Sequence, residues 1–354
     1  MCGEGCVEGR QHWKWSIRGF MLTCIHRAMI DVNFHRGLEL PLHGLWLDPH
    51  GRRPFAFVSH AHSDHIARHE EVIASPGTLR LMKARIGGKR REHLMEFGER
   101  RVFGNFAITL LPAGHILGSA QSFIETGAGT LLYTGDFKLR PGLSTAAAQW
   151  RQADTLIMET TFGLPKYRMP PTEAVLAQVV AFCRGTLDAG GVPVLLAYSL
   201  GKSQEILCAL LAAGLTPMLH DAVWKMTAIY RELHAGFPSG AVPYEAREVP
   251  GKVLIFPPNT TRSHPLAHLE NKRTAILTGW ALDPGAIYRY GCDAAFPLTD
   301  HADYPDLLRY VDLVQPRRVL TLHGFAAPFA TDLRARGIEA WALSQENQLE
   351  LPLR

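Results

Sequence analysis

Between residues 45 and 158, short apolar runs alternate with turn residues, a pattern typical of β-strands. Strands are predicted at residues 45–47, 54–59, 106–111, 122–125, 130–134 and 155–158. The apolar spacing also predicts two amphipathic helices, one from residue 64 into the 70s and one at 77–86. Because little helix is predicted between residues 95 and 145, this half of the chain is expected to be sheet-rich α/β.

After residue 171 the pattern changes to helices and strands in alternation. The predicted helices cover 172–188, 203–213, 221–234, 303–314 and 328–336. The predicted strands cover 192–198, the neighbourhood of Met218, 253–256, 318–322 and 338–343. Such alternation implies parallel pairing and a second α/β unit. Residues 1–38 have no clear period and are expected to form a poorly ordered N-terminal extension.

Composition narrows the class of protein only modestly. The length of 354 residues corresponds to about two domains, and 47% apolar with 20% charged residues excludes a disordered or collagen-like chain. The net charge of +4 permits a nucleic-acid partner without requiring one. The six cysteines lack the spacing of a disulfide framework, which favours reduced thiols in the cytoplasm. No apolar run approaches the roughly 18 residues of a membrane span, so neither membrane association nor secretion is expected.

The strongest chemical signal is the run SHAHSDH at residues 59–65, directly after a predicted strand. Imidazole and carboxylate are ligands of zinc and manganese. His60 and His62 lie two residues apart in extended chain and can face one ion. Asp64 and His65, at the turn that follows, can serve a second ion.

The order His-x-His-x-Asp-His after a strand resembles the signature of the metallo-β-lactamase fold hydrolases. This resemblance implies two further ligands. The run GHILGSA at 114–120 is similar to the family's third motif, with His115 as the ligand. The run YTGDF at 133–137 is similar to the fourth, with Asp136 bridging two metal ions.

Three later motifs resemble those of the β-CASP subgroup, whose members process nucleic acids. They are ETTFG at 159–163, LTDHAD at 298–303 with His301, and TLHG at 321–324 with His323. The resemblance implies an αββα metallo-β-lactamase sandwich with an inserted β-CASP α/β cap. The implied division is an extension at 1–38, the first part of the metallo-β-lactamase domain at 39–164, the cap at 165–297, and the C-terminal part of the metallo-β-lactamase domain at 298–354.

A mechanism can be built on these positions. Two divalent ions about 4 Å apart, zinc or alternatively manganese, would clamp a phosphodiester and activate a water. We assign one ion to His60, His62 and His115, the other to Asp64, His65 and His323, and Asp136 to both. Asp64 is also counted with the catalytic residues. His301 is then free to act as the general acid, and Glu159 would hydrogen-bond it and raise its pKa.

The chain most resembles the bacterial ligase-associated exonucleases of this subgroup, on the run ETTFGLPKYRMP, the stretch around His301 and the ending around His323. This implies a DNA exonuclease acting in DNA repair and DNA damage, with an ATP-dependent DNA ligase and a helicase as partners. The alternative is an RNA-processing nuclease like ribonuclease J or the mRNA 3′-end endonuclease, which His323 favours. The cap and His301 argue against a small-molecule hydrolase, and the complete ligand set argues against an inactive scaffold.

For the residues that would contact the substrate, the sequence leaves more than one interpretation. Lys202 and Ser203, at a predicted helix start, could hold a substrate phosphate or simply begin the helix. Lys166 and Arg168 flank an aromatic residue near the predicted site, where they could contact nucleic acid or pack a linker. The basic residues between 83 and 101 favour a solvated surface over a phosphate contact. Asp48, ahead of a proline, is predicted to be a turn residue, with support of a metal ligand as the alternative.

Overall fold

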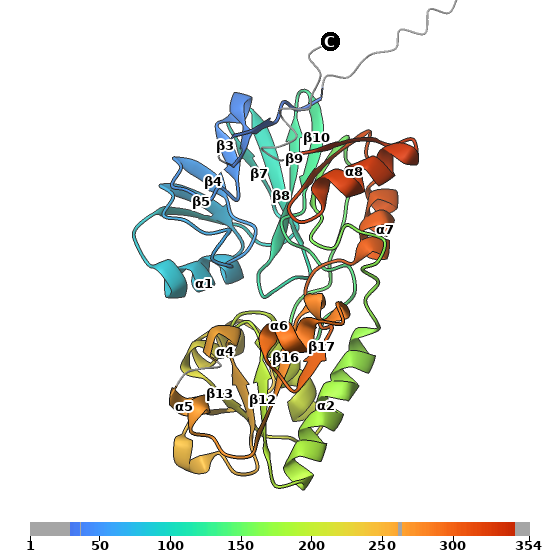
Figure 1. The fold of residues 1–354 in the computed structure, drawn as a ribbon. Helices are drawn as coiled ribbons and strands as arrows, with labels where there is room; N and C mark the ends of the chain where they lie inside the picture. Colours follow the sequence, from blue (N-terminus) through green and yellow to red (C-terminus); the bar gives the residue numbers. More distant parts are fainter. Residues whose placement is uncertain (1–28, 36, 261–263, 344–354) are drawn as a thin grey trace, which may run out of the picture.

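The computed structural model describes residues 29–35, 37–260 and 264–343, and it contains two sheets packed face to face and a third sheet apart from them (Figure 1). The first sheet has the order β1-β2-β3-β4-β5-β6. Its strands are β1 (Asn33–Phe34), β2 (Leu38–Leu40), β3 (Leu45–Leu47), β4 (Phe55–Phe57), β5 (Glu71–Ala74) and β6 (Arg91–Leu94). The mixed α/β class expected from the sequence is confirmed.

The second sheet has the order β19-β18-β11-β10-β9-β8-β7. Its strands are β7 (Arg100–Phe103), β8 (Phe106–Pro112), β9 (Ala120–Thr126), β10 (Gly129–Tyr133), β11 (Thr155–Glu159), β18 (Arg318–Leu322) and β19 (Glu339–Ala342). Leu47 and Phe57 of the first sheet share one core with Leu110 and Tyr133 of the second. The two sheets therefore bury their apolar faces against each other.

Helices cover the outer faces of this pair of sheets. Successive residues of β5 point to opposite sides, so that Ile73 packs between the sheets while Val72 and Ala74 pack with α1 (Pro76–Ile86). On the far side of the second sheet, Met158 packs with α7 (Tyr304–Val314) and α8 (Ala326–Ala335). Asp303 caps α7, because its side chain accepts from the backbone N–H of Asp306.

The third sheet is parallel throughout and has the order β14-β13-β15-β12-β16-β17. Its strands are β12 (Val192–Leu196), β13 (Pro217–Leu219), β14 (Val242–Pro243), β15 (Val253–Phe256), β16 (Lys272–Leu277) and β17 (Ala294–Phe296). The main helices of this unit are α2 (Thr172–Asp188), α3 (Lys202–Ala212), α4 (Asp221–Leu233), α5 (His264–Ala267) and α6 (Ala286–Tyr290). Short 3-10 turns lie at Pro41–His43, Ala246–Glu248, Pro258–Thr260 and Gly279–Leu282. The predicted parallel α/β unit is confirmed.

This unit is inserted between two neighbouring strands of the second sheet. The chain leaves that sheet after β11 and returns as β18, which pairs with β11 in parallel, Thr155 opposite Arg318. The inserted unit also shares a core with the first sheet, since Val72 and Leu81 pack in the same cluster as Leu195 and Ile255. Strand β5 of the first sheet, helix α1 and the inserted unit therefore pack against one another.

Some sequence-based expectations were wrong. The helix predicted from residue 64 into the 70s is absent, because residues 71–74 form strand β5, which places Val72 and Ala74 in one core and Ile73 in another. Strand β16 was not predicted, since its first half is polar. Asn33, Phe34 and Leu38 of the predicted extension take part in the first sheet through β1 and β2, and residues 1–28 lie outside the described residues. Cys183, Cys208 and Cys292 are free and buried, while the other three cysteines also lie outside the described part.

Leu110 tests the packing of the first two sheets. Its side chain is fully buried between them, so Leu110→Ala should cost about 2–5 kcal/mol, because less apolar surface is buried and a cavity remains. Val102→Ala in β7 is the control, because Val102 is 61% exposed and its truncation should change stability by no more than about 0.5 kcal/mol. Denaturation curves of both variants measure the effect. Equal stability of the two would contradict the assigned core.

Candidate metal centre

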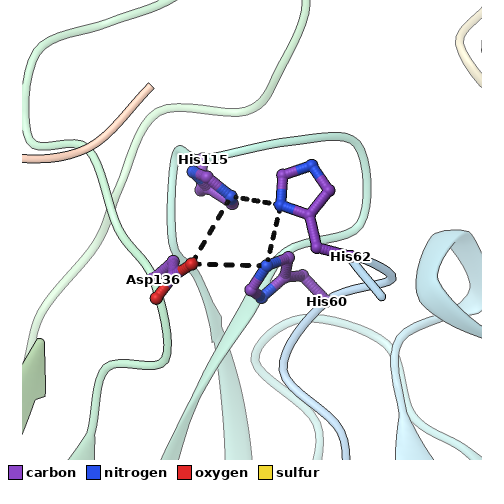
Figure 2. Close-up of side chains that lie close together, drawn as sticks. All are labelled: His60, His62, His115 and Asp136. Atoms are coloured by element: carbon purple, nitrogen blue, oxygen red, sulfur yellow. Dashed lines mark hydrogen bonds and ion pairs between the residues drawn. The ribbon is translucent and has the colours of Figure 1, made fainter. Parts of the chain in front are cut away.

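The metal-ligand candidates lie in loops that follow four strands, one of which is β18 (Arg318–Leu322), directly followed by His323. His60, His62 and His65 come after β4, His115 comes after β8, and Asp136 comes after β10. The close approach of the first two sheets brings these loops together. Figure 2 shows His60, His62, His115 and Asp136 converging from separate segments on a common point.

The four side chains form a tight cluster of ligand atoms. His62 Nδ1 lies 3.1 Å from His60 Nε2 and 3.0 Å from His115 Nε2. Asp136 Oδ2 lies 3.5 Å from His60 Nε2 and 3.9 Å from His115 Nε2. Three nitrogen atoms and one oxygen atom, all within 4.8 Å of one another, are a ligand set suited to zinc.

Each imidazole of this cluster is also held by its other ring nitrogen. The contacts are His60 Nδ1 to Ser59 Oγ at 3.0 Å, His62 Nε2 to Leu200 O at 3.1 Å, and His115 Nδ1 to Asp300 O at 2.8 Å. A backbone carbonyl only accepts, so His62 and His115 must carry a proton on the outer nitrogen, which leaves the inner lone pair free. Histidines that bind metal are oriented in this way by groups behind the ring.

The charge states fit metal binding. Burial lowers the pKa of His62 to about 3 and of His115 to about 4, and it places the pKa of His60 well below its usual range. Burial opposes ionisation of Asp136, but the neighbouring His65 and His301 outweigh it and hold the pKa of this carboxyl well below normal. At neutral pH the cluster therefore offers neutral imidazoles and a carboxylate, the forms that bind divalent metals.

A second group of ligands adjoins the first through Asp136. His65 Nε2 lies 3.4 Å from Asp136 Oδ2 and 3.8 Å from Asp64 Oδ2, and its ring centroid is 5.9 Å from that of His323. The structure brings Asp64 and His323 to the same cavity, but outside the clusters of closely spaced ligand atoms.

Asp48 is the residue that sequence reasoning undervalued. Its carboxylate accepts from His65 Nδ1 at 2.9 Å, Ser59 N at 2.7 Å, Tyr133 Oη at 2.8 Å and the Ser59 hydroxyl. Asp48 therefore supports His65 from behind, which was the alternative to a simple turn residue. The sequence did contain a signal for this role, since Asp48 directly follows strand β3, just as each ligand motif directly follows a strand.

His301 and Glu159 form a separate pair beside the ligands. His301 Nδ1 lies 2.8 Å from Glu159 Oε1, so the expected hydrogen bond is present, and Phe137 N donates to the same oxygen at 2.9 Å. Burial alone would lower the pKa of His301, but the carboxylates of Glu159, Asp136 and Asp300 raise it to about 10. His301 therefore carries a proton at neutral pH when no metal is bound, as does His65, whose pKa is raised by Asp136 and Asp48.

A cavity of about 550 Å³ adjoins the cluster of candidate ligands, and of these four side chains His62 and Asp136 line it. The loop after β12 forms part of its wall, with Tyr198 61% exposed, and Arg85 from the last turn of α1 also lines it. These two side chains offer an aromatic face and a cation, and neither was predicted from the sequence to line the site. The remaining lining residues are His62, Ser63, Asp64, His65, Asp136, Thr161, Ser199, Leu200, Asp300, His301 and His323.

The four suggested substrate contacts lie away from this wall. Ser203 is fully buried and its hydroxyl donates to Tyr198 O, and Lys202 is buried with its Nζ 2.8 Å from Asp300 Oδ1. Lys166 is exposed and pairs with Asp283 at 3.3 Å, and Arg168 is exposed. In this structure Lys202 and Ser203 therefore support the site from within the protein rather than face the cavity.

Sequence comparison finds relatives named for nucleic-acid enzymes and factors. The chain is 53% identical over 329 residues to a protein of Opitutus terrae named "Probable DNA ligase", a match that covers 92% of this chain and 32% of that protein. It is 30% identical over 196 residues to the transcription termination factor FttA of Pyrococcus abyssi, covering 51% of this chain and 29% of that protein. It is also 30% identical over 170 residues to an RNase J-like protein of Methanocaldococcus jannaschii, covering 46% and 40%. The chain thus spans about a third of the length of these curated relatives.

The fold has a counterpart among solved structures. A protein of unknown function from Enterococcus faecalis V583 superposes with a TM-score of 0.58 at 14% identity, over 81% of this chain and 78% of that one. No protein-family model matches the sequence. Among the helices of the described residues, none has the length and apolar character needed to cross a membrane.

His62 tests the metal assignment, since both neighbouring imidazoles approach its Nδ1. His62→Ala should lower the metal content of the purified protein by about one ion per chain, because the closest cluster then lacks one of its ligands. Elemental analysis measures this, and His50→Ala, at an exposed position outside the clusters, is the control. Full metal content in His62→Ala would refute the assignment.

Acidification should destabilise the metal-free protein between about pH 6 and 4.5, below the range in which His301 and His65, with their raised pKa values, act in the opposite sense. Burial lowers the pKa of His62 to about 3 and of His115 to about 4, so the folded chain keeps both rings neutral in this range. In the unfolded chain they take up protons near pH 6.5. The unfolded state then binds more protons, and the free energy of unfolding decreases as the pH falls. Melting temperatures of chelator-treated protein measure the effect, and His115→Gln should flatten it; an unchanged slope in that variant would count against this cause.

Proposed function

We propose that this chain is a metal-dependent phosphodiesterase of nucleic acid, a DNA exonuclease of the metallo-β-lactamase fold and its β-CASP subgroup. The observation that carries the proposal is the convergence of His60, His62, His115 and Asp136 on one point, beside a cavity that His62, Asp136 and His301 line. The fold supports it, because paired sheets with outer helices and an inserted α/β unit are the arrangement that the motifs imply. We propose the division 39–164 and 298–354 for the hydrolase domain and 165–297 for the cap.

The residues present fit two divalent ions. His60, His62 and His115 would hold the first, His65 with Asp64 and His323 the second, and Asp136 both. The nitrogen-rich ligand set favours zinc, with manganese as the alternative. When bound, such ions polarise a phosphodiester and lower the pKa of a water.

His301 is proposed as the general acid. Glu159 fixes Nδ1 of its ring and the surrounding carboxylates favour the protonated form, so Nε2 can hold a proton for the leaving oxygen. Asp300 lies 3.9 Å from this Nε2 and is itself paired with the buried Lys202. The role proposed for Lys202 is therefore to position Asp300.

Tyr198 and Arg85 are proposed to hold the substrate. An exposed tyrosine ring suits stacking with a base of any sequence, and an arginine suits a phosphate. They belong to the inserted unit and to α1 respectively, so a strand bound between them would lie across the metal cluster.

DNA is favoured as the substrate over RNA. The match at 53% identity, which covers nearly the whole chain, is to a protein named for DNA ligation. Most of that protein lies outside the matched region, which supports a DNA ligase as a functional partner, with a helicase by the resemblance described above. A second candidate is RNA processing, which the partial matches to FttA and the RNase J-like protein favour.

The decisive experiment is a side-by-side assay on DNA and RNA of one sequence, labelled at either end. With manganese or zinc, the protein should shorten DNA, and His62→Ala or Asp136→Ala should abolish this. His301→Ala should lower kcat by about 10²- to 10⁴-fold while metal content is retained. His50→Ala should behave as wild type.

The outcome also separates the alternatives. Cleavage of RNA with survival of DNA would replace the first function with the second. A fully metal-loaded protein that cuts neither polymer would refute both.

A further inference from the structure

A second cavity, of about 430 Å³, is lined mainly by cationic side chains. Arg52, Arg68, Lys89 and Arg90 contribute to its wall, together with the backbone of Gly87 and Gly88. Gly87 and Gly88 have φ of +54° and +84°, a conformation that side-chain-bearing residues avoid, and no atom lies within 4 Å of where a Cβ would stand. The loop therefore leaves its backbone open at the cavity.

Two buried side chains of this wall have donors without acceptors among the described residues. His69 is 1% exposed, and its Nδ1 accepts from Arg53 N at 3.2 Å, so the ring proton is on Nε2, which has no partner. The Arg90 side chain is 2% exposed; its Nη2 donates to Gly87 O, whereas Nη1 has no partner. Buried donors are rarely left unsatisfied, so this wall is suited to an acceptor that the protein itself does not supply.

The charges indicate that this acceptor is an anion. Glu70 on the wall pairs with Arg52 at 3.2 Å, and Glu92 lies 3.3 Å from Arg90 Nε. Arg68 and Lys89 are exposed and have no carboxylate within ion-pair distance in the described part of the chain. Two cations and two buried donors thus remain for a ligand, a set that suits the oxygens of a phosphate.

The same two chain segments contribute to both cavities, although the two linings have no residue in common. The segment that carries Asp64 and His65 into the metal cavity continues to Arg68 and His69 in the basic one. Likewise, Arg85 of α1 lines the metal cavity, and the loop that follows α1 lines the basic one. These two segments are the route along which a strand held at Arg85 would have to run in order to reach the second cavity.

We propose that the basic cavity binds a backbone phosphate of the nucleic-acid strand whose scissile bond lies at the metal cluster. This inference rests on the proposed function and adds to it a second contact outside the catalytic cavity. The site reads phosphate rather than base, so it contributes affinity and direction of binding without sequence preference.

Charge reversal at the two exposed cations tests the proposal without disturbing the core. Binding of labelled single-stranded oligonucleotides of increasing length is measured by fluorescence anisotropy in the His301→Ala background, which limits cleavage. Arg68→Glu with Lys89→Glu should weaken binding of the longer strands about tenfold or more at low salt. The slope of log affinity against log salt should fall by about 0.7 for each phosphate that the protein no longer neutralises. A dinucleotide, which fills only the metal cavity, should bind as before.

Arg289→Glu is the matched control, because Arg289 is exposed on α6 and lines neither cavity. Unchanged affinity for long strands in the double variant, or an equal weakening in Arg289→Glu, would overturn the proposal. If the double variant no longer binds inorganic phosphate but still binds long strands as wild type does, the cavity is a site for a free anion, and the proposal is overturned. If the wild-type chain cleaves DNA and the double variant cleaves it equally well, this inference alone is refuted. If the wild-type chain neither binds nor cleaves nucleic acid, the proposed function is refuted as well.

Discussion

The structure depends on one electrostatic constraint, the convergence of lone pairs from three imidazoles and one carboxylate on a small buried volume. Such groups repel one another unless a cation lies between them, so the fold must hold them in place by contacts made elsewhere. His62 is held by the carbonyl of Leu200 and His115 by the carbonyl of Asp300, both outside the first two sheets. The inserted unit is therefore part of the site's scaffold, since without the loop after β12 the outer nitrogen of His62 would have no acceptor.

Asp48 holds the other side of the cluster. A buried carboxylate is tolerated only when its oxygens are hydrogen-bonded, and Asp48 accepts from Ser59, His65 and Tyr133. These contacts join the loops after β3 and β4 to strand β10 of the second sheet. The turn after β10 comes so close that a Cβ on Gly135, at φ +55°, would lie 2.5 Å from Ser59 Cβ. Glycine at this position thus allows the Asp136 loop to approach the histidine loop.

Sequence alone could predict the candidate ligands but not what orients them. The spacing of His60, His62, Asp64 and His65 after a strand is a recognisable pattern of metal ligands. The groups that orient the rings are the carbonyls of Leu200 and Asp300, which are backbone atoms that any residue provides. Residues 71–74 were predicted to be helical because a short apolar run does not distinguish helix from strand, and only burial on two faces does so. Ser203 was proposed as a phosphate contact because a helix start is visible in sequence, but the side of the helix that faces the cavity is not.

The groups behind each ring separate the histidines into two electrostatic kinds. His62 and His115 are backed by neutral carbonyl oxygens, and burial therefore keeps them neutral. His301 is backed by the carboxylate of Glu159, and its pKa rises to about 10 although the ring is chemically identical. Different surroundings push the pKa values of like groups apart, and one site can therefore contain both neutral ligands and a proton donor. His65 belongs to the second kind, because the carboxylates of Asp48 and Asp136 on either side raise its pKa well above the usual value in the metal-free chain. Binding a cation at His65 Nε2 must therefore release a proton, and Asp48 then remains to hold the Nδ1–H and orient the ring.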